Sequence, residues 1–397
     1  MKKETVKYSI ILPVYNGLGY IENCVNTIIT QDYNDYELII VDDCSNDGTR
    51  EYLKEIDNPN IKVVFQEENL GAIGNFSSAI SFATGSWVIF LGVDDGLQSY
   101  FFDLADRLTN ICERKGLRII ASSRAHYFWE GASKLHGNKA IQYTAREEFS
   151  VLDSNKEILL SLLGAQAYFE LPQMYSNSLF HRSLLVEAKE KQNGNLFLTV
   201  PPDVNLAAIG LTLEKKYLKS FIPLGWVGTS SSATKYRGKD SDDDGVIFNK
   251  IRYDTAAGKP SLGSLVIYLW NALLCTSSLR SELENRLYKK KYFKVFVFSS
   301  ALAELRKRRV LRERKPLFDM LLSRNDLREL PILYLSYLIG IIAFFIFNYR
   351  KVKNKIKNLF KPSFHIKLER KDSMCMLKES QRIAKNLEII VRNESTK

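Results

Sequence analysis

Residues 8–16 read YSIILPVYN, and residues 37–48 read ELIIVDDCSNDG. In each stretch a run of apolar residues ends in polar ones, which is typical of a buried strand followed by a loop. We expect a third strand over residues 61–65, and a similar apolar run occupies residues 87–91. Strands that alternate with helices indicate a parallel sheet with crossover helices, and uninterrupted apolar strands indicate a sheet covered on both faces. The helices expected between these strands span residues 20–29, 47–56 and 75–83.

The α/β pattern continues beyond the fourth strand. We predict a further strand over Ile119–Ser122 and helices over Glu147–Leu163 and Asp203–Leu213. The polar stretch Lys235–Gly245 marks the end of this first domain, which we assign to residues 1–240. Beyond it we expect a helical extension over 241–330, a hydrophobic membrane-associated helix over 331–349 and a basic polar tail over 350–397.

Composition narrows the class of protein. The 397 residues correspond to about two domains. With 45% hydrophobic and 25% charged residues, the chain is not a disordered, collagen-like or many-spanning membrane protein. The net charge of +11 favours an anionic partner such as a nucleic acid, a membrane surface or a phosphorylated ligand. The basic block Arg306–Arg309 has no interleaved aromatic residues, so we expect no nucleic acid partner.

The cysteines and the first residues bear on location. The five cysteines are odd in number and show no metal-binding spacing, which indicates reduced thiols in a cytoplasmic protein. Residues 1–5 run directly into the first strand without the apolar stretch of a signal peptide. We therefore expect the first domain to lie in the cytoplasm.

Residues 332–347 carry no charge and approach the ~17–25 residues of a membrane-spanning helix. Basic residues flank both sides, so a single span would place one basic flank outside, against the positive-inside bias. An in-plane or re-entrant helix would face anionic headgroups with both flanks, and a helix buried in protein is the third possibility. We expect association with the inner face of the membrane, with its mode open. The flanking charges are Arg324, Arg328, Arg350, Lys351, Lys353, Lys355 and Lys357.

Polar residues follow three of the predicted strands where the strands end. Asn16 follows the first strand, the pair Asp42-Asp43 follows the second, and the pair Asp94-Asp95 follows the fourth. Ligands of open α/β sheets bind at the carboxyl ends of the strands, so these groups predict one site. Adjacent carboxylates suit a hard cation, Mg²⁺ or Mn²⁺, that also holds phosphate oxygens.

The order and spacing of these motifs resemble the family 2 glycosyltransferases with a GT-A fold. The resemblance rests on SIILPVYN at 9–16, ELIIVDDCSNDGT at 37–49, ENLG at 68–71 and FLGVDD at 90–95, and it is looser over 98–230. It implies an α/β architecture, the GT-A (Rossmann-like) nucleotide-diphospho-sugar transferase fold, here followed by a C-terminal α-helical extension.

The resemblance also implies a nucleotide-binding side of the site. The loop at the end of the first strand would meet the base and the ribose, and Asp42 with Asp43 would accept a hydrogen bond from a uracil ring. Asn75 and Asp94 are assigned to the same nucleotide site. The residues of the loop are Pro13, Val14, Tyr15 and Asn16.

The reacting side of the site follows from the same resemblance. Asp94 and Asp95 would hold Mg²⁺ or Mn²⁺, which stabilises the leaving diphosphate. Asp203, in the segment Pro202–Asn205, would be the catalytic base that takes the proton of the acceptor hydroxyl in an inverting transfer.

Two departures from the family pattern bear on activity. Gly92 stands where many members have the first Asp of a DxD motif. Residues 71–75 read GAIGN, so the arginine of the family's Ala-Arg-Asn motif is absent. Lys235 or Arg237 is a candidate replacement for that cation.

Each assignment has a structural alternative. Asp42 could simply close its strand, Asn16 could be a turn residue, and the Asp94-Asp95 pair could cap a helix. Asp203 could be an ordinary N-cap after Pro202, because Asp is favoured there.

We expect an inverting glycosyltransferase that moves a sugar from a nucleotide-diphosphate donor, a UDP-sugar, to a cell-surface polysaccharide or lipid-linked glycan. The alternative is a catalytically impaired relative that binds nucleotide or glycan and organises a membrane glycan-assembly complex. The chain lacks the GxGxxG motif of dinucleotide dehydrogenases and the GxxxxGK[ST] motif of P-loop NTPases. It also lacks the glycine-rich loop of sugar nucleotidyltransferases after the first strand.

Overall fold

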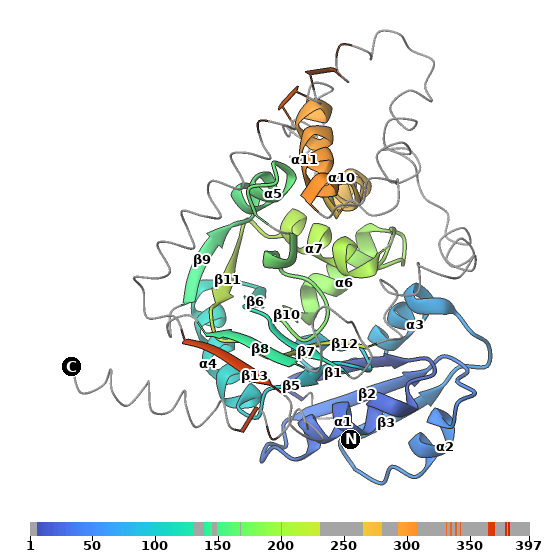
Figure 1. Ribbon diagram of the computed structural model, residues 1–397. Helices are drawn as coiled ribbons and strands as arrows, with labels where there is room; N and C mark the ends of the chain where they lie inside the picture. Colours follow the sequence, from blue (N-terminus) through green and yellow to red (C-terminus); the bar gives the residue numbers. More distant parts are fainter. Residues whose placement is uncertain are drawn as a thin grey trace.

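The main sheet of this computed structural model has eight strands, with helices on both faces (Figure 1). From one edge to the other, the strands are β3 (Ile61–Phe65), β2 (Tyr36–Asp42), β1 (Tyr8–Val14), β4 (Trp87–Phe90), β10 (Ser178–His181), β6 (Ile119–Ser122), β11 (Lys216–Ser220) and β9 (Phe149–Asp153). The structure describes residues 6–129, 139–144, 149–166, 168–199, 201–230, 265–279, 293–307 and 364–369, and single positions between 331 and 381.

The first half of this sheet is parallel, as the sequence predicts. β3, β2, β1 and β4 pair in parallel register. β10 is inserted antiparallel between β4 and β6, and β11 continues parallel to β6. The carboxyl ends of β1, β2, β4 and β6 therefore lie along one edge of the sheet, which confirms the predicted α/β fold class.

Each central strand contributes to two separate hydrophobic cores. Ile11 and Phe90 belong to one core, whereas Ile10 and Leu12 belong to the other. Successive side chains of a strand point to opposite faces, so a continuous apolar run is what a doubly covered sheet requires. Helices α3 (Gly71–Ile80), α6 (Arg182–Lys191) and α7 (Pro202–Leu213) line the first core, and α1 (Leu18–Ile29), α2 (Thr49–Lys54) and α4 (Phe101–Lys115) line the second.

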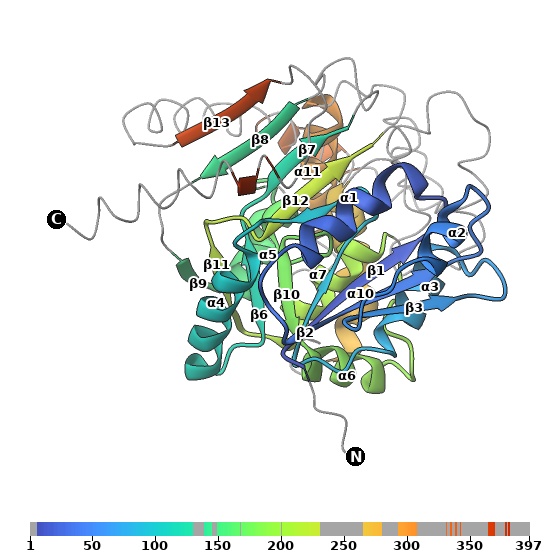
Figure 2. The same ribbon diagram turned by 90° about the horizontal axis from the view of Figure 1, so that it is seen from below.

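A second sheet of five strands includes the strands that follow β4 and β6 of the main sheet in the chain. Figure 2 shows its outer strands side by side on one flank of the molecule. Its strands, in order, are β13 (Phe364–Glu369), β8 (Lys139–Thr144), β7 (Ala125–Phe128), β12 (Gly225–Thr229) and β5 (Gly96–Leu97). β5 follows Asp95 directly and β7 follows Arg124 directly, so this sheet fixes the loops that leave β4 and β6.

The helix predicted over 147–163 is partly wrong. Residues 149–153 form the edge strand β9, which pairs antiparallel with β11, and α5 covers only Ser154–Leu162. The Asp153 carboxylate accepts a hydrogen bond from the Lys156 N–H at 2.9 Å and caps this helix. Pairing with β11, distant in the sequence, gives these residues their strand conformation.

The described part of the C-terminal extension is helical, as predicted. α10 (Leu265–Cys275) and α11 (Phe293–Lys307) lie beside α7 in Figure 1, and Trp270 and Val297 are buried in the same core as Phe180 of β10. These helices therefore share a core with the α/β domain. The predicted boundary at 235–245 lies outside the described residues. Within the described part of the chain, no helix has the length and apolar content to cross a membrane.

Candidate functional site

Asn16 joins the loops that follow β1 and β2. Its N–H donates to Ser45 Oγ at 2.8 Å, and its Oδ1 accepts from the Asn46 N–H at 2.9 Å. Its φ of 51° is left-handed, a conformation that Asn adopts more readily than most residues. Pro13 is half-buried in β1 and Tyr15 is exposed. The predicted base-binding loop is thus held by a cross-link between two strand ends.

The neighbouring carboxylates of Asp42 and Asp43 have different surroundings. Asp42 is fully buried and lies 3.3 Å from Arg50 Nε. Asp43 receives a hydrogen bond from the Leu70 N–H at 2.7 Å, and its own N–H donates to the Val14 carbonyl at 2.9 Å. Burial raises the pKa of the Asp43 carboxyl. Asp42 is therefore committed to an internal ion pair, and Asp43 lies between the loops at the ends of β1 and β3.

Asn75 lies beneath these carboxylates. Its Nδ2 donates to the Val41 carbonyl at 2.9 Å, and the side chain is buried. Gln66 Nε2 donates to Asn75 Oδ1 at 3.5 Å. The structure thus places Asn75 where it supports the end of β2.

Asp95 fastens the loop after β4 to the second sheet. Its Oδ2 accepts from the Gly92 N–H at 2.7 Å and its Oδ1 from the Gly228 N–H at 2.7 Å. Burial, with the nearby charge of Asp94, raises the pKa of the Asp95 carboxyl. Asp94 is half-buried, and its Oδ2 accepts from the Ser230 N–H at 3.1 Å. Both oxygens of Asp95 thus serve the backbone, while Asp94 is the carboxylate that a ligand can reach.

Gly92 leaves little room for the aspartate found in many family members. A Cβ at this position would lie 3.2 Å from Asp95 Oδ2, 3.3 Å from Asp94 Oδ1 and 3.5 Å from Tyr175 Cδ1. The space is taken by the two carboxylates and by an aromatic ring. A side chain at position 92 would therefore require its neighbours to move.

Asp203 lies in the first turn of α7, at the end of the first core. Its Oδ2 accepts from the Tyr168 hydroxyl at 3.0 Å. The N-cap position is Pro201, so Asp203 is not the capping residue of the structural alternative. Burial raises the pKa of the Asp203 carboxyl, against the opposing effects of Tyr168 and Arg124. Asp203 is a buried carboxylate whose ionised form is held by one phenol and one nearby cation.

Tyr175 connects the two acidic groups. Burial, followed by the charges of Asp203, Asp95 and Asp94, raises the pKa of its phenol. The charges of the predicted metal-binding pair and of the predicted base therefore all raise the pKa of the same phenol, that of Tyr175. Lys235 and Arg237, the predicted replacement cations, lie outside the described residues.

The sequence analysis assigned no catalytic or binding role to two residues of this site, Arg124 and Tyr168. Tyr168 lies in the short 3₁₀ helix η1 (Tyr168–Glu170), and Arg124 lies between β6 and β7. Arg124 had a usable signal, because it follows a correctly predicted strand at its carboxyl end. Tyr168 had none, because its contact with Asp203 spans 35 residues.

The site suits a metal held jointly with a phosphorylated ligand. The described residues contain no group of three His, Cys, Asp or Glu side chains that could hold an ion by themselves. Mg²⁺ is commonly bound by one or two carboxylates together with substrate phosphates and water. The half-buried Asp94 carboxylate matches that arrangement, and both oxygens of the buried Asp95 carboxylate accept a backbone hydrogen bond.

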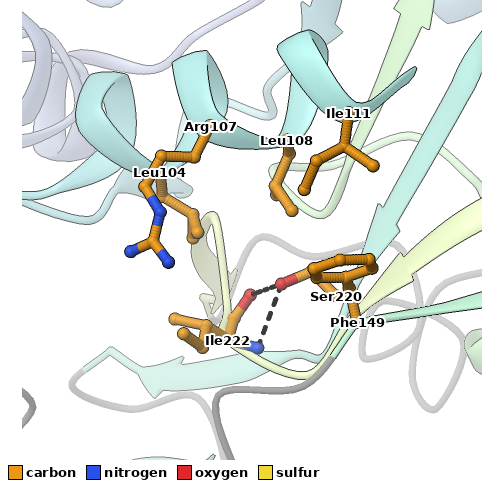
Figure 3. A pocket seen from close by; sticks show the side chains of 7 residues that line it. All are labelled: Leu104, Arg107, Leu108, Ile111, Phe149, Ser220 and Ile222. Atoms are coloured by element: carbon orange, nitrogen blue, oxygen red, sulfur yellow. Dashed lines mark hydrogen bonds between the residues drawn. The ribbon is translucent and has the colours of Figure 1, made fainter. Parts of the chain in front are cut away.

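A small hollow between α4 and the β9–β11 edge is unrelated to these residues. It is about 30 Å³ in volume, room for about one water molecule, and none of its lining residues is a candidate site residue. Figure 3 shows the Ser220 hydroxyl satisfied by the backbone of Ile222 across this hollow.

Comparison with known proteins identifies the N-terminal region. The model of the family described as "Glycosyl transferase family 2" matches residues 9–158. Residues 9–158 belong to glycosyl transferase family 2. The match contains the β1, β2 and β4 strand ends with Asp43, Asp94 and Asp95, and it stops before Asp203.

Curated relatives resemble this chain over the same region. A putative teichuronic acid biosynthesis glycosyltransferase, TuaG of Bacillus subtilis (strain 168), is 44% identical over 89 residues, 22% of this chain and 35% of the relative. WfgD of Escherichia coli, named UDP-Glc:alpha-D-GlcNAc-diphosphoundecaprenol beta-1,3-glucosyltransferase, is 36% identical over 87 residues, 22% of this chain and 34% of the relative. The chain thus spans about a third of the length of these two relatives.

The crystal structure of S. aureus TarS 1-349 in complex with UDP aligns over 87% of this chain and 92% of that one, with 17% sequence identity and a TM-score of 0.44.

Gly228 provides a test of the close contact between β12 and the loop of Asp94 and Asp95, which the hydrogen bond from the Gly228 N–H to Asp95 holds. A Cβ on Gly228 would overlap the carbonyl oxygen of Asp94, so we expect Gly228→Ala to cost about 1–3 kcal/mol of unfolding free energy through overpacking. Gly19→Ala is the matched control, because nothing lies within 4 Å of a Cβ there. Urea denaturation measures the free energy of unfolding of both variants. Equal stability of the two would contradict the close contact between Gly228 and the Asp94–Asp95 loop.

Proposed function

We propose that this chain is an inverting glycosyltransferase that moves a sugar from a UDP-linked donor to a hydroxyl group of a cell-surface polysaccharide or lipid-linked glycan. The observation that carries the proposal is the buried Asp203 carboxylate, which accepts a hydrogen bond from Tyr168 at 3.0 Å. It lies near the loop of Asp94, because the charges of Asp203 and Asp94 both raise the pKa of the Tyr175 phenol. The names of relatives, which include teichuronic acid and a diphosphoundecaprenol acceptor, support this acceptor class.

Asp203 is proposed to act as the general base. Its ionised form accepts the proton of the acceptor hydroxyl as that oxygen attacks the anomeric carbon and the bond to the leaving diphosphate breaks. Tyr168 orients the carboxylate through the 3.0 Å hydrogen bond. Because the attack and the departure occur on opposite sides of that carbon, the configuration inverts.

The donor is proposed to bind along the ends of β1, β2 and β4. Pro13, Val14, Tyr15 and Asn16 form the loop for the base and ribose, with Asp43 as the hydrogen-bond acceptor for uracil. Asp42 and Asn75 support the end of β2 next to this loop. Asp42 does so through its ion pair with Arg50, and Asn75 through its hydrogen bond to the Val41 carbonyl. Asp94 would hold Mg²⁺ or Mn²⁺, which neutralises charge on the leaving diphosphate.

A nucleotide-binding protein without transferase activity is the second candidate. Gly92 and the absence of arginine from residues 71–75 favour it. Metal-dependent hydrolysis of the donor in the absence of acceptor distinguishes the two, because a binding protein should release no free sugar.

Asp94 should decide metal-dependent nucleotide binding. Calorimetry of UDP with and without Mn²⁺ should give a metal-dependent affinity that falls at least about tenfold in Asp94→Asn, since a carboxylate ligand is lost. Asp103→Asn, an exposed carboxylate on α4, should bind as the wild type does. Unchanged, metal-dependent binding by Asp94→Asn would remove Asp94 from the metal site.

Tyr168 should set the pH dependence of transfer. Asp203 works as a base only when ionised, so kcat/KM falls as the pH drops through its raised pKa. In Tyr168→Phe the hydrogen bond that stabilises the carboxylate is lost, and the acidic limb should move upward by about one to two pH units. Tyr52→Phe on α2 is the control, and Asp203→Asn should abolish the limb together with most activity. An unshifted limb in Tyr168→Phe would contradict the base assignment.

We further propose that residues 331–349 lie in the plane of the inner membrane face. The described helical positions Tyr334, Leu335, Leu338 and Ile342 are 71%, 49%, 59% and 58% exposed, and three of them share one helix side at spacings of four. The chain then returns to the domain, where β13 pairs with β8. Residues 350–363 are too few for a second crossing, which needs about 20 residues.

Vesicle binding tests this arrangement. The double variant Leu338→Glu/Ile342→Glu should lose most of its binding to phosphatidylglycerol vesicles, whereas Val186→Glu, at an exposed position of α6, should not. With the protein bound to the outside of sealed vesicles, added protease should remove a C-terminal tag completely. A tag protected inside the vesicles would contradict the in-plane arrangement.

A further inference from the structure

Arg124 occupies the edge of the sheet where the proposed donor site lies. It follows β6 and precedes β7, with one residue between it and the end of β6. Ala125 pairs with Trp226 of β12, and two residues further along β12 the Gly228 N–H binds Asp95. The same strand, β12, therefore fixes both Arg124 and the loop that carries the acidic pair.

The side chain of Arg124 is packed within reach of the reacting side of the site. Its guanidinium carbon lies 4.9 Å from the centre of the Phe169 ring. That ring lies 4.3 Å from the ring of Tyr168, whose hydroxyl donates to Asp203. The two neighbouring rings of Phe169 and Tyr168 thus connect Arg124 to the proposed base by direct contacts.

The guanidinium of Arg124 has an unmet hydrogen-bonding requirement. Its Nε is buried and has no hydrogen-bond partner among the described residues. No described carboxylate lies within 4.0 Å of its nitrogens, so Arg124 is not simply the ion-pair partner of a neighbouring aspartate. Buried donors are rarely left without a partner, and those of charged groups are the most costly. An anionic ligand could supply the hydrogen-bond acceptor that the buried Nε lacks.

Other cations at this end of the sheet are already committed. Arg50 lies 3.3 Å from Asp42, and Lys219 donates to Glu170 at 3.1 Å. Residues 71–75 contain no arginine. Of Arg50, Lys219 and Arg124, only Arg124 has no described carboxylate within 4.0 Å of its nitrogens.

We infer that Arg124 binds an anionic group of the donor next to the bond that breaks. Two donor groups have this chemistry: the phosphate that bears the sugar, and a carboxylate carried on the sugar itself. The planar guanidinium fork suits either one, because it can donate two parallel hydrogen bonds to a phosphate or a carboxylate. This inference rests on the proposed donor site and adds its anion-binding residue.

Binding ratios separate the two sources in the full-length protein. If Arg124 binds the phosphate, Arg124→Gln should reduce the preference for UDP over UMP by about ten- to a hundredfold, the loss expected for hydrogen bonds to a charged group. If it binds a sugar carboxylate, the preference for UDP-glucuronic acid over UDP-glucose should fall instead, with UDP binding unchanged. Either result supports the inference and names the group.

Two further variants keep the test interpretable. Arg124→Lys retains the charge without the fork and should recover part of the lost ratio. Arg114→Gln removes an exposed arginine of α4 and should change neither ratio. If folded Arg124→Gln protein keeps both wild-type ratios, the inference is overturned while the donor site stands. If folded wild-type protein binds none of these nucleotides, the proposed function itself is overturned.

Discussion

The Asp95 carboxylate is the interaction on which the geometry of the site depends. It bonds to the Gly92 N–H in its own loop and to the Gly228 N–H in the second sheet, each at 2.7 Å. The two bonds are made inside the protein, where a carboxylate is stable only if its oxygens are satisfied. Because one oxygen binds the loop and the other binds β12, the loop after β4 is fixed relative to β12. Asp94, one residue earlier, is half-buried and accepts from the Ser230 N–H at 3.1 Å.

Carboxylates in this site have different capacities because their partners differ. Asp42 is fully buried, pairs with Arg50 and also accepts from the Ser45 N–H at 3.2 Å. Each oxygen of the buried Asp95 carboxylate accepts one backbone hydrogen bond. Asp94 is half-buried and accepts from the Ser230 N–H, whereas Asp203 is buried and accepts from the Tyr168 hydroxyl. The carboxylates of the site therefore differ in their burial and in the partners that the fold provides.

The sequence was sufficient for the parallel half of the fold and for the motifs at its strand ends. Residues 61–65 and 119–122 are strands with the predicted bounds. The second of these is buried along its whole length, as a strand covered on both faces requires, whereas the first is a partly exposed edge strand. Residues 149–153 were missed because their pairing with β11 is a long-range contact. The separate roles of Asp94 and Asp95 could not be predicted either, since adjacent identical residues are distinguished only by the strand that reaches one of them.

The packing around position 92 explains the glycine there better than loss of the first Asp of a DxD motif does. Tyr175, whose ring lies against Gly92, has a φ of 73°, and Ser176 follows at 63°. Left-handed backbone costs such residues about 1–3 kcal/mol each and persists only where the surroundings enforce it. Ser176 supplies that enforcement, because its N–H donates to the Phe90 carbonyl and its Oγ to the Trp226 carbonyl, both at 2.9 Å. The strained turn places the Tyr175 ring 3.5 Å from where a Cβ at position 92 would lie, an ordinary packing distance, whereas the Asp95 and Asp94 carboxylates lie closer, at 3.2 and 3.3 Å. Strain of this kind gathers at functional sites, and here it lies beside the loop that carries Asp94 and Asp95.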